Sequence, residues 1–350
     1  MEIPSIFLNR LLKEAAKRNA SSMHLSVGSQ PALRVGGQLI SLNEENIITT
    51  EIIDKIISTF LSEEEQRELK ENKEIITVRD IAGGLRFRVD IFYQKNLPSA
   101  SFNYISPEIK SLYEIKAPSS LKDIMKLKAG LFIVSGSYGS GKTTTAASLI
   151  EEINKNYKKN IVTIEDPIEF LFIGKESIIS QRQVGRDVKS VTRAIEHCLE
   201  EDADIVYLGE IKKDFEEAVP KILELAAGNS LVVWEINANS SIRAIEKILN
   251  AAIKHLSPEA ARYSLADILL GIIDQRLIPK VGGGLVLAVE FMLASGPVKS
   301  LIREGKIYQL ESIIQTSKKE GMISMSKALE DLIKAGEIRQ EDADGLKIAE

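Results

Sequence analysis

The segment from Gly136 to Thr143, Gly-Ser-Tyr-Gly-Ser-Gly-Lys-Thr, carries the clearest chemistry in the sequence. It matches the P-loop pattern, in which glycines let backbone N–H groups converge on phosphate oxygens and the following helix N-terminus favours negative charge. Lys142 would reach the β- and γ-phosphates, and the hydroxyl of Thr143 would hold Mg²⁺. We therefore predict an ATP site formed by Gly136, Ser137, Tyr138, Gly139, Ser140, Gly141, Lys142, Thr143 and Thr144.

Two acidic segments supply the other groups that phosphoryl transfer needs, because carboxylates must hold the metal and orient water. The first runs from Glu165 to Glu169 and follows one apolar run, and Glu210 follows another. A single acidic residue at a strand end is usually a solvated loop charge. Acidic residues at the ends of two successive strands after a P-loop favour a functional role, because ligands lie at the carboxyl ends of parallel strands.

From residue 119 onwards, short apolar runs alternate with helical patterns. One run directly precedes the P-loop, and a helix is expected from Thr144. This alternation predicts an α/β domain whose largely parallel sheet is covered on both faces. The last ~90 residues are expected to be mainly helical, with an apolar stripe between Met325 and Ile333. The predicted strands are Leu131–Val134, Ile161–Ile164, Ile205–Leu208 and Leu231–Ile236.

The first ~105 residues have a different texture. Residues 32–40 predict a hairpin that turns at Gly36-Gly37, and residues 75–92 predict another around Gly83-Gly84. Leu8, Leu11, Leu12 and Ala15 form one face of an amphipathic helix. A meander with helices on one face is an α+β layer. Prolines 107 and 118 bracket a segment unsuited to one regular element, so we predict domains at 1–107 and 119–350, joined by a linker at 108–118.

Composition sets outer limits on the function. Lys and Arg total 45 against 50 Asp and Glu, which argues against a protein that mainly neutralises nucleic-acid phosphate. The single cysteine, Cys198, excludes an intrachain disulfide and suits a reducing compartment. The most apolar run, 285–294, is short and contains Glu290, so no membrane span is expected. With no signal peptide visible at the N-terminus, the expected location is cytoplasmic.

Taken together, these segments resemble the type IV pilus retraction ATPases of the type II/IV secretion ATPase superfamily, over nearly the whole chain. The combination is more specific than the P-loop alone, which would name only a superfamily. The segments that carry the resemblance are Ser22–Ser26, Pro31–Gln38, the Asp box Val162–Glu169, Gln181–Gly185, the Walker B segment Leu208–Ile211, and Pro297–Lys306, which is similar to the family motif AIRNLIREGK.

The resemblance implies a PAS-like N-terminal domain joined flexibly to a RecA-like ATPase domain. It implies a homohexameric ring, or a mixed ring with a paralogue, at the cytoplasmic face of the inner membrane. ATP turnover with Mg²⁺ would move domains and drive the platform protein at the pilus base to disassemble the fibre, with no nucleic acid involved.

The resemblance also implies roles for individual residues. Glu169 would be the general base for the attacking water, and Glu210 the Walker B carboxylate near Mg²⁺. Glu165 and Asp166 would support them. Two arginines of the first domain are the candidates to reach the γ-phosphate, namely Arg86 and Arg88.

Three departures from the family pattern bear on catalysis. No histidine lies between His197 and His255, so the family's His box is replaced, by Ser230 and Asn237. No arginine lies between Arg88 and Arg182, and the later arginines of the N-terminal domain fall at Asn96 and Asn103. Lys212-Lys213-Asp214 stands where Arg-Asp usually follows Walker B. An arginine finger contributes about 10³–10⁵ in rate, so we predict good Mg-nucleotide binding with slow or partner-dependent hydrolysis.

Three functions are therefore open. The first is a retraction motor, which the absence of the extra N-terminal domain usual in extension motors favours. The second is a nucleotide-binding regulatory or structural paralogue that joins an active motor, which the missing histidines and arginines favour. The third, a RecA-like DNA translocase, is opposed by the net negative charge and by the lack of an aromatic and basic stacking platform.

Overall fold

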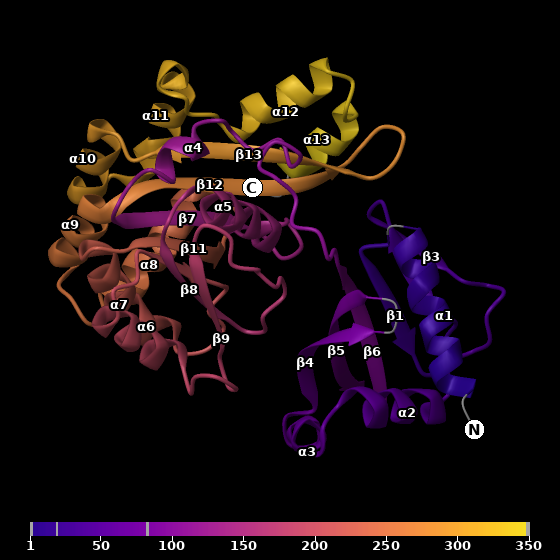
Figure 1. Cartoon of the computed structure of the whole chain (residues 1–350). Coiled ribbons are helices and arrows are strands. Elements are labelled where there is room, and N and C mark those ends of the chain that lie inside the picture. Colours follow the sequence, from indigo (N-terminus) through magenta and orange to yellow (C-terminus); the bar gives the residue numbers. More distant parts are fainter. Residues whose placement is uncertain (1–2, 19, 82–83, 348–350) are drawn as a thin grey trace. The chain divides into compact units, whose positions relative to one another are not determined.

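The computed structural model describes residues 3–18, 20–81 and 84–347 (Figure 1). The chain forms two compact units. The first comprises Met1–Glu108 with Gly282–Leu285, and the second comprises Ile109–Val281 with Val286–Glu350. The limits of the linker at residues 108–118 stay a prediction.

The first unit is built on a six-stranded antiparallel sheet among its described residues. Its strands are β1 (Ser22–Ser26), β2 (Ala32–Val35), β3 (Gln38–Ser41), β4 (Glu74–Ile81), β5 (Leu85–Gln94) and β6 (Leu97–Ile105). Both predicted hairpins are confirmed, β2 with β3 and β4 with β5, although Gly83 lies outside the described residues. The expected single meander is wrong. The order β3-β2-β1-β6-β5-β4 joins two meanders, with the well-buried β1 and β6 at the centre and the exposed β3 at an edge.

Three helices cover this sheet: α1 (Ile3–Lys17), α2 (Thr50–Phe60) and α3 (Glu63–Asn72). Leu8, Leu11, Leu12 and Ala15 of α1 are all buried, which confirms the predicted amphipathic face. They belong to one apolar cluster with residues of α2 and α3 and with alternate residues of β5, such as Phe87. The unit is therefore an α+β layer, as predicted.

The second unit is built on a seven-stranded sheet in the order β13-β12-β7-β11-β10-β8-β9 (Figure 1). The strands β12, β7, β11, β10, β8 and β9 run parallel to one another, and β13 joins the edge as the hairpin partner of β12. All four predicted strands are confirmed. The strands are β7 (Gly130–Gly136), β8 (Asn160–Glu165), β9 (Ile178–Gln183), β10 (Ile205–Leu208), β11 (Leu231–Asn237), β12 (Leu269–Pro279) and β13 (Leu285–Leu293).

Helices cover both faces of this sheet, as the buried strands require. Successive residues of β7 point to opposite faces. Leu131 and Ile133 join the cluster that contains α6 to α9, whereas Phe132 and Val134 join the cluster that contains α5. The helices are α4 (Leu121–Ile124), α5 (Lys142–Asn156), α6 (Val191–Glu200), α7 (Phe215–Ala227), α8 (Ser241–Ala252), α9 (Pro258–Ile268), α10 (Gly296–Glu304), α11 (Leu310–Thr316), α12 (Met325–Lys334) and α13 (Gln340–Lys347), with short 3₁₀ turns at Ile307–Gln309 and Lys318–Glu320.

The C-terminal ninety residues contain more helix than strand, as expected, but they also contain a hairpin whose first strand the sequence analysis did not predict. The hairpin β12–β13 supplies two long strands to the sheet, and a turn at Gly282–Gly284, where all three φ angles are positive, connects them. Asp274, Gln275 and Arg276 interrupt the apolar pattern of β12, which hides a strand that is buried on both faces. The most apolar run of the sequence is β13, and among the residues described no helix has the length and apolar character needed to cross a bilayer.

Candidate nucleotide site

The P-loop connects β7, which is buried throughout, to the start of α5. A Cβ atom on Gly136 would lie 2.3 Å from Ser140 Oγ and 2.6 Å from the carbonyl oxygen of Gln275, so the loop closes too tightly for any other residue there. Gly141 begins α5 with φ +87°, and no described side chain caps this helix. The first amides of α5 therefore remain available to an anion.

Lys142 is only 5% exposed, although it carries a charge. Its Nζ donates to the carbonyl oxygens of Gly136 and Ser137, at 3.0 Å each. The same Nζ lies 3.8 Å from Oε2 of Glu210. The sheet thus brings together the P-loop lysine and the Walker B carboxylate, as the sequence predicts.

The loop fits a bound triphosphate with its metal. Ser140 Oγ and Gln275 Oε1 are buried without a hydrogen-bond partner among the described residues. Tyr138 and the neighbouring Ser137 and Gly139 are exposed at the outer part of the loop. No cluster of three or more metal-ligating side chains occurs in the described part of the chain. Mg²⁺ suits such a site, because it is usually held by one or two protein oxygens plus substrate phosphates.

The acidic segment after β8 lies at the same edge of the sheet. Oε1 of Glu165 accepts from Thr163 Oγ1 at 2.7 Å and from Gln181 Nε2 at 3.3 Å. Burial raises the pKa of Glu165 to about 7, and the nearby charge of Glu169 acts in the same direction. Asp166 is exposed, and its carbonyl oxygen accepts from Lys212 Nζ at 2.7 Å. Its interactions are therefore with the segment after Walker B.

Glu235 is a site residue that the sequence analysis missed. It lies inside β11 and is only 3% exposed. Its Oε2 accepts from Thr143 Oγ1 at 3.1 Å, and its Oε1 accepts from Tyr207 OH at 2.5 Å. Burial raises its pKa to about 8, against the opposing effect of the hydrogen bond from Tyr207. One signal in the sequence could have identified Glu235, namely an acidic residue within an apolar strand. A carboxylate buried in this way almost always has a partner.

Asp274 of β12 is a second residue that the sequence analysis missed. It pairs in register with Ser135 of β7, and its Oδ1 accepts from Ser135 Oγ at 2.7 Å. Burial raises the pKa of Asp274 to about 7. Three carboxyl groups with raised pKa therefore lie on β8, β11 and β12, namely those of Glu165, Glu235 and Asp274.

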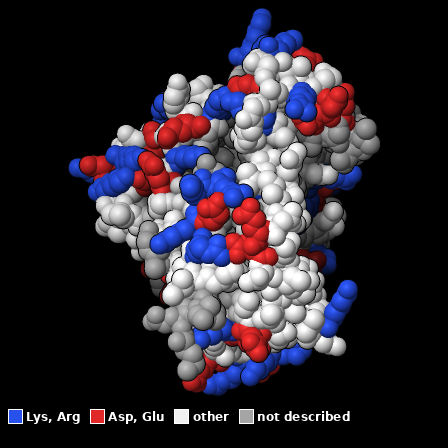
Figure 2. All heavy atoms as spheres, turned by 90° about the vertical axis from the view of Figure 1, so that its right-hand side faces the viewer, with Lys and Arg blue, Asp and Glu red and all other residues white. Residues whose placement is uncertain are grey.

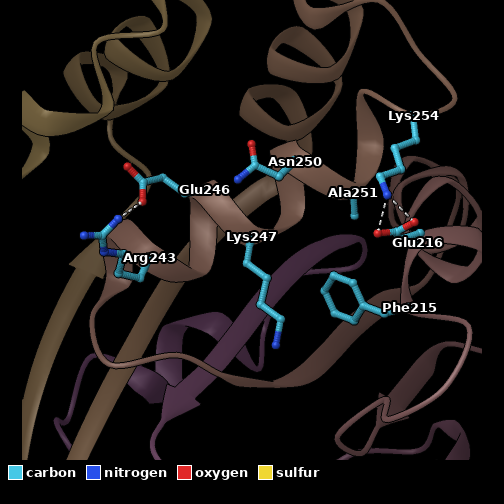
Figure 3. Close-up of a pocket in the computed structure, with 8 residues that line it drawn as sticks. All are labelled: Phe215, Glu216, Arg243, Glu246, Lys247, Asn250, Ala251 and Lys254. Atoms are coloured by element: carbon cyan, nitrogen blue, oxygen red, sulfur yellow. Dashed lines mark hydrogen bonds and ion pairs between the residues drawn. The ribbon is translucent and has the colours of Figure 1, made fainter.

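A hollow of about 450 Å³ lies between α7 and α8 (Figure 3). Its basic groups have partners within it: Lys254 Nζ bonds both oxygens of Glu216 at 2.6 Å, and Lys247 Nζ lies 4.9 Å from the ring centre of Phe215. Lys247 also donates to the carbonyl oxygen of Asn237, at the end of β11. Because these lysines already have partners in the hollow, the hollow attracts a phosphate less strongly than the P-loop does.

A comparison with protein families identifies the family of this chain. The family model described as Type II/IV secretion system protein matches residues 2–285. The chain belongs to the type II/IV secretion system protein family.

Within this family, the chain is similar to pilus retraction proteins. It is 32% identical to the type IV pilus retraction ATPase PilT of Pseudomonas aeruginosa over 96% of both chains. It is 30% identical to the type IV pilus ATPase PilU of the same organism, over 95% of this chain and 87% of that one. A crystal structure of the pilus retraction motor PilT with bound ADP matches with a TM-score of 0.80 at 35% identity, covering 96% of this chain and 95% of the other. The predicted resemblance and fold class are confirmed.

The two arginines proposed from the secretion family lie on β5 of the first unit. Arg86 forms an ion pair with Asp80, with Nη1 at 2.8 and 3.0 Å from its two oxygens. Arg88 lies directly opposite Asn103 of β6. Asn96 occupies the tight turn between these strands with φ +62°, a conformation that asparagine tolerates better than arginine. Contact of either arginine with a nucleotide stays a prediction.

The two residues that replace the family's histidines have different environments. Asn237 Nδ2 donates to Glu210 Oε1 at 3.3 Å, so Asn237 lies at the site. Ser230 is buried at the other end of β11, where its hydroxyl donates to the carbonyl oxygen of Ala203 at 2.7 Å. Of these two residues, only Asn237 therefore contacts a carboxylate of the candidate site.

Proposed function

We propose that this protein is a subunit of an ATP-driven motor of the pilus retraction type. The observation that carries the proposal is the P-loop lysine, Lys142, buried at the mouth of a parallel sheet with the carboxylate of Glu210 3.8 Å away. The membership in a family of secretion and pilus ATPases makes it an ATP hydrolase.

In the proposed reaction, the α5 amides and Lys142 bind the phosphates of ATP. Bound Mg²⁺ neutralises phosphate charge, and Thr143 and Glu210 are the residues that would hold it. The carboxylate of Glu169 takes a proton from water while the water oxygen bonds to the γ-phosphorus. The bond to the β,γ-bridging oxygen breaks, and ADP and inorganic phosphate leave. Glu165 accepts a hydrogen bond from the backbone N–H of Glu169 and so holds this base.

The larger assembly belongs to the same proposal. The subunits form a homohexameric ring, or a mixed ring with a paralogue, at the cytoplasmic face of the inner membrane. The ring acts on the platform protein at the base of a pilus and drives twitching motility. Support comes from the 96% coverage and 32% identity with PilT.

A second candidate is a regulatory subunit that binds nucleotide and hydrolyses it slowly or only beside an active partner. Asn237 supports it, because a neutral amide, rather than a titratable imidazole, contacts Glu210. Asn103 supports it as well, because it lacks the charge with which an arginine stabilises the transition state. Basic and acidic side chains lie side by side over the face shown in Figure 2, which gives no support to a DNA translocase.

One set of variants tests the proposal. Lys142→Ala should weaken ATP binding tenfold or more and abolish phosphate release, because it removes the charge that holds the β- and γ-phosphates. Glu169→Gln should retain ATP binding but lower phosphate release by about 10²–10³, because it removes only the base. The exposed Lys158→Ala and Glu176→Gln are matched controls.

Phosphate release is measured with each protein alone and mixed with an active PilT-type partner. Release that rises only in the mixture would favour the regulatory candidate. If the isolated protein releases phosphate rapidly, and Lys142→Ala abolishes this release, the prediction of slow hydrolysis is refuted. Unchanged ATP binding in Lys142→Ala would refute the site itself.

A further inference from the structure

We propose that Glu235 is a positioning residue, which fixes the hydroxyl of Thr143 for the divalent cation that accompanies the nucleotide. The inference rests on the proposed Mg-ATP site. It adds to that site a third carboxylate, which acts through Thr143.

The position of Glu235 is rigidly defined. It lies on β11, which pairs with β7 on one side and β10 on the other, directly opposite Val134. Oε1 accepts from the hydroxyl of Tyr207, a residue that is itself buried among the apolar side chains beneath α5. With one oxygen held by the core, the other is directed at Thr143, and Thr143 Oγ1 donates to it at 3.1 Å.

This hydrogen bond determines what the hydroxyl can offer a cation. A threonine hydroxyl has one proton and two lone pairs, and its proton rotates to suit its surroundings. A divalent cation close by favours the ionised form of Glu235, and donation to that carboxylate commits the hydroxyl proton of Thr143 to the protein, so the lone pairs stay available for a metal. Without the acceptor, the hydroxyl can turn its proton toward the cation or bond a carbonyl of its own helix.

Packing alone does not account for a carboxyl group at this place. A buried polar group is tolerated only when it is hydrogen-bonded, and an apolar side chain of similar volume would often stabilise the strand as well. Leu231 and Val233 show that apolar side chains fit other positions on the same face of β11. Position 235 differs from these positions because its side chain contacts the hydroxyl of Thr143.

Glu235 and Glu210 therefore have separate tasks. Glu210 lies beyond the end of β10, near Lys142 and Asn237. Glu235 lies within the sheet, on Tyr207 and Thr143. Partners that orient the groups on a metal typically contribute 10- to 100-fold to metal affinity.

The test compares binding of a fluorescent methylanthraniloyl-ATP in excess Mg²⁺ and in EDTA. The Mg²⁺-dependent gain is the ratio of the affinity in Mg²⁺ to the affinity in EDTA. Glu235→Leu removes the acceptor and should lower this gain about tenfold, while the affinity in EDTA stays the same. Glu235→Gln retains an oxygen acceptor of the same reach and should keep most of the gain. Glu235→Asp withdraws the carboxylate by one methylene and should lose the gain, even if Glu235→Leu proves unstable.

A double-variant cycle separates positioning from a purely structural effect. In the background of Thr143→Val, which lacks the hydroxyl, a change from Glu235 to Leu should have no further effect on the Mg²⁺-dependent gain. Equal losses of affinity in Mg²⁺ and in EDTA, or an unchanged gain in both Glu235→Leu and Glu235→Asp, would overturn the inference. A wild-type protein that binds no nucleotide in either condition would overturn the proposed function as well.

Discussion

The buried carboxyl groups of Glu165, Glu235 and Asp274 make the stability of the protein depend on pH. Burial raises the pKa of these groups to about 7, about 8 and about 7. An acid whose pKa is raised on folding holds its proton more tightly in the folded state. Its contribution to stability is therefore complete below pH 4.5 and is lost as the pH rises through 7 to 8.

We expect the free energy of unfolding to fall between pH 6.5 and 8.5, by up to about 1.4 kcal/mol per pH unit for each linked proton. Urea unfolding followed by the fluorescence of Trp234, the only tryptophan, measures it in the second unit. Glu235→Gln should make the slope of the free energy of unfolding against pH less steep, by no more than the contribution of one linked proton. A flat or rising profile over this range would contradict the raised pKa values. Cys198, whose burial raises its pKa to about 11, does not contribute in this window.

The sequence predicted those residues of the site whose function leaves a local motif. Lys142 and Glu210 each follow a predicted strand in a recognised pattern, and they meet at the sheet edge. Glu235 and Asp274 carry no motif, because their partners Tyr207 and Ser135 are distant in sequence. Only the pairing of strands brings such residues together.

Trp234 anchors the helices that cover one face of the parallel sheet. It is fully buried in β11 and stacks on Phe215 of α7, with ring centres 5.4 Å apart. Trp234→Ala should therefore lower the free energy of unfolding by about 3–5 kcal/mol, through lost burial and the cavity left behind. Urea titration followed by circular dichroism measures this. Tyr113→Ala, at a position 89% exposed, is the control and should change it by less than about 0.5 kcal/mol. A loss for Trp234→Ala no larger than that of the control would contradict the packing role.

Elements with an uninterrupted pattern could be predicted, and elements with a broken pattern could not. The strands β7, β8, β10 and β11 each contain at least three consecutive apolar residues or nearly so, and they were found from the sequence. β12 contains three consecutive polar residues, Asp274, Gln275 and Arg276, so its sequence does not resemble a core strand. Asp274 and Gln275 bond to Ser135 and Ser140 beside the P-loop, and Arg276 bonds to Asn239. The polar residues that obscure this strand are partly those that serve the candidate site.

The proposed ring predicts a change in size for the whole molecule. With Mg-ATP, light scattering should find a species of roughly six times the 38.7 kDa chain, because a nucleotide that binds the proposed ring better than the free subunit favours assembly. Lys142→Ala should remain smaller under the same conditions. A wild-type protein that stays monomeric at all nucleotide and protein concentrations would contradict the ring.

The contacts of Lys142 have a consequence for a machine with several such sites. The ammonium group of Lys142 is held by two carbonyl oxygens of its own loop, with Glu210 nearby. Each subunit of the proposed ring would therefore hold its phosphate-binding lysine in place by itself. Neighbouring subunits of such a ring would then be able to hydrolyse ATP at different times.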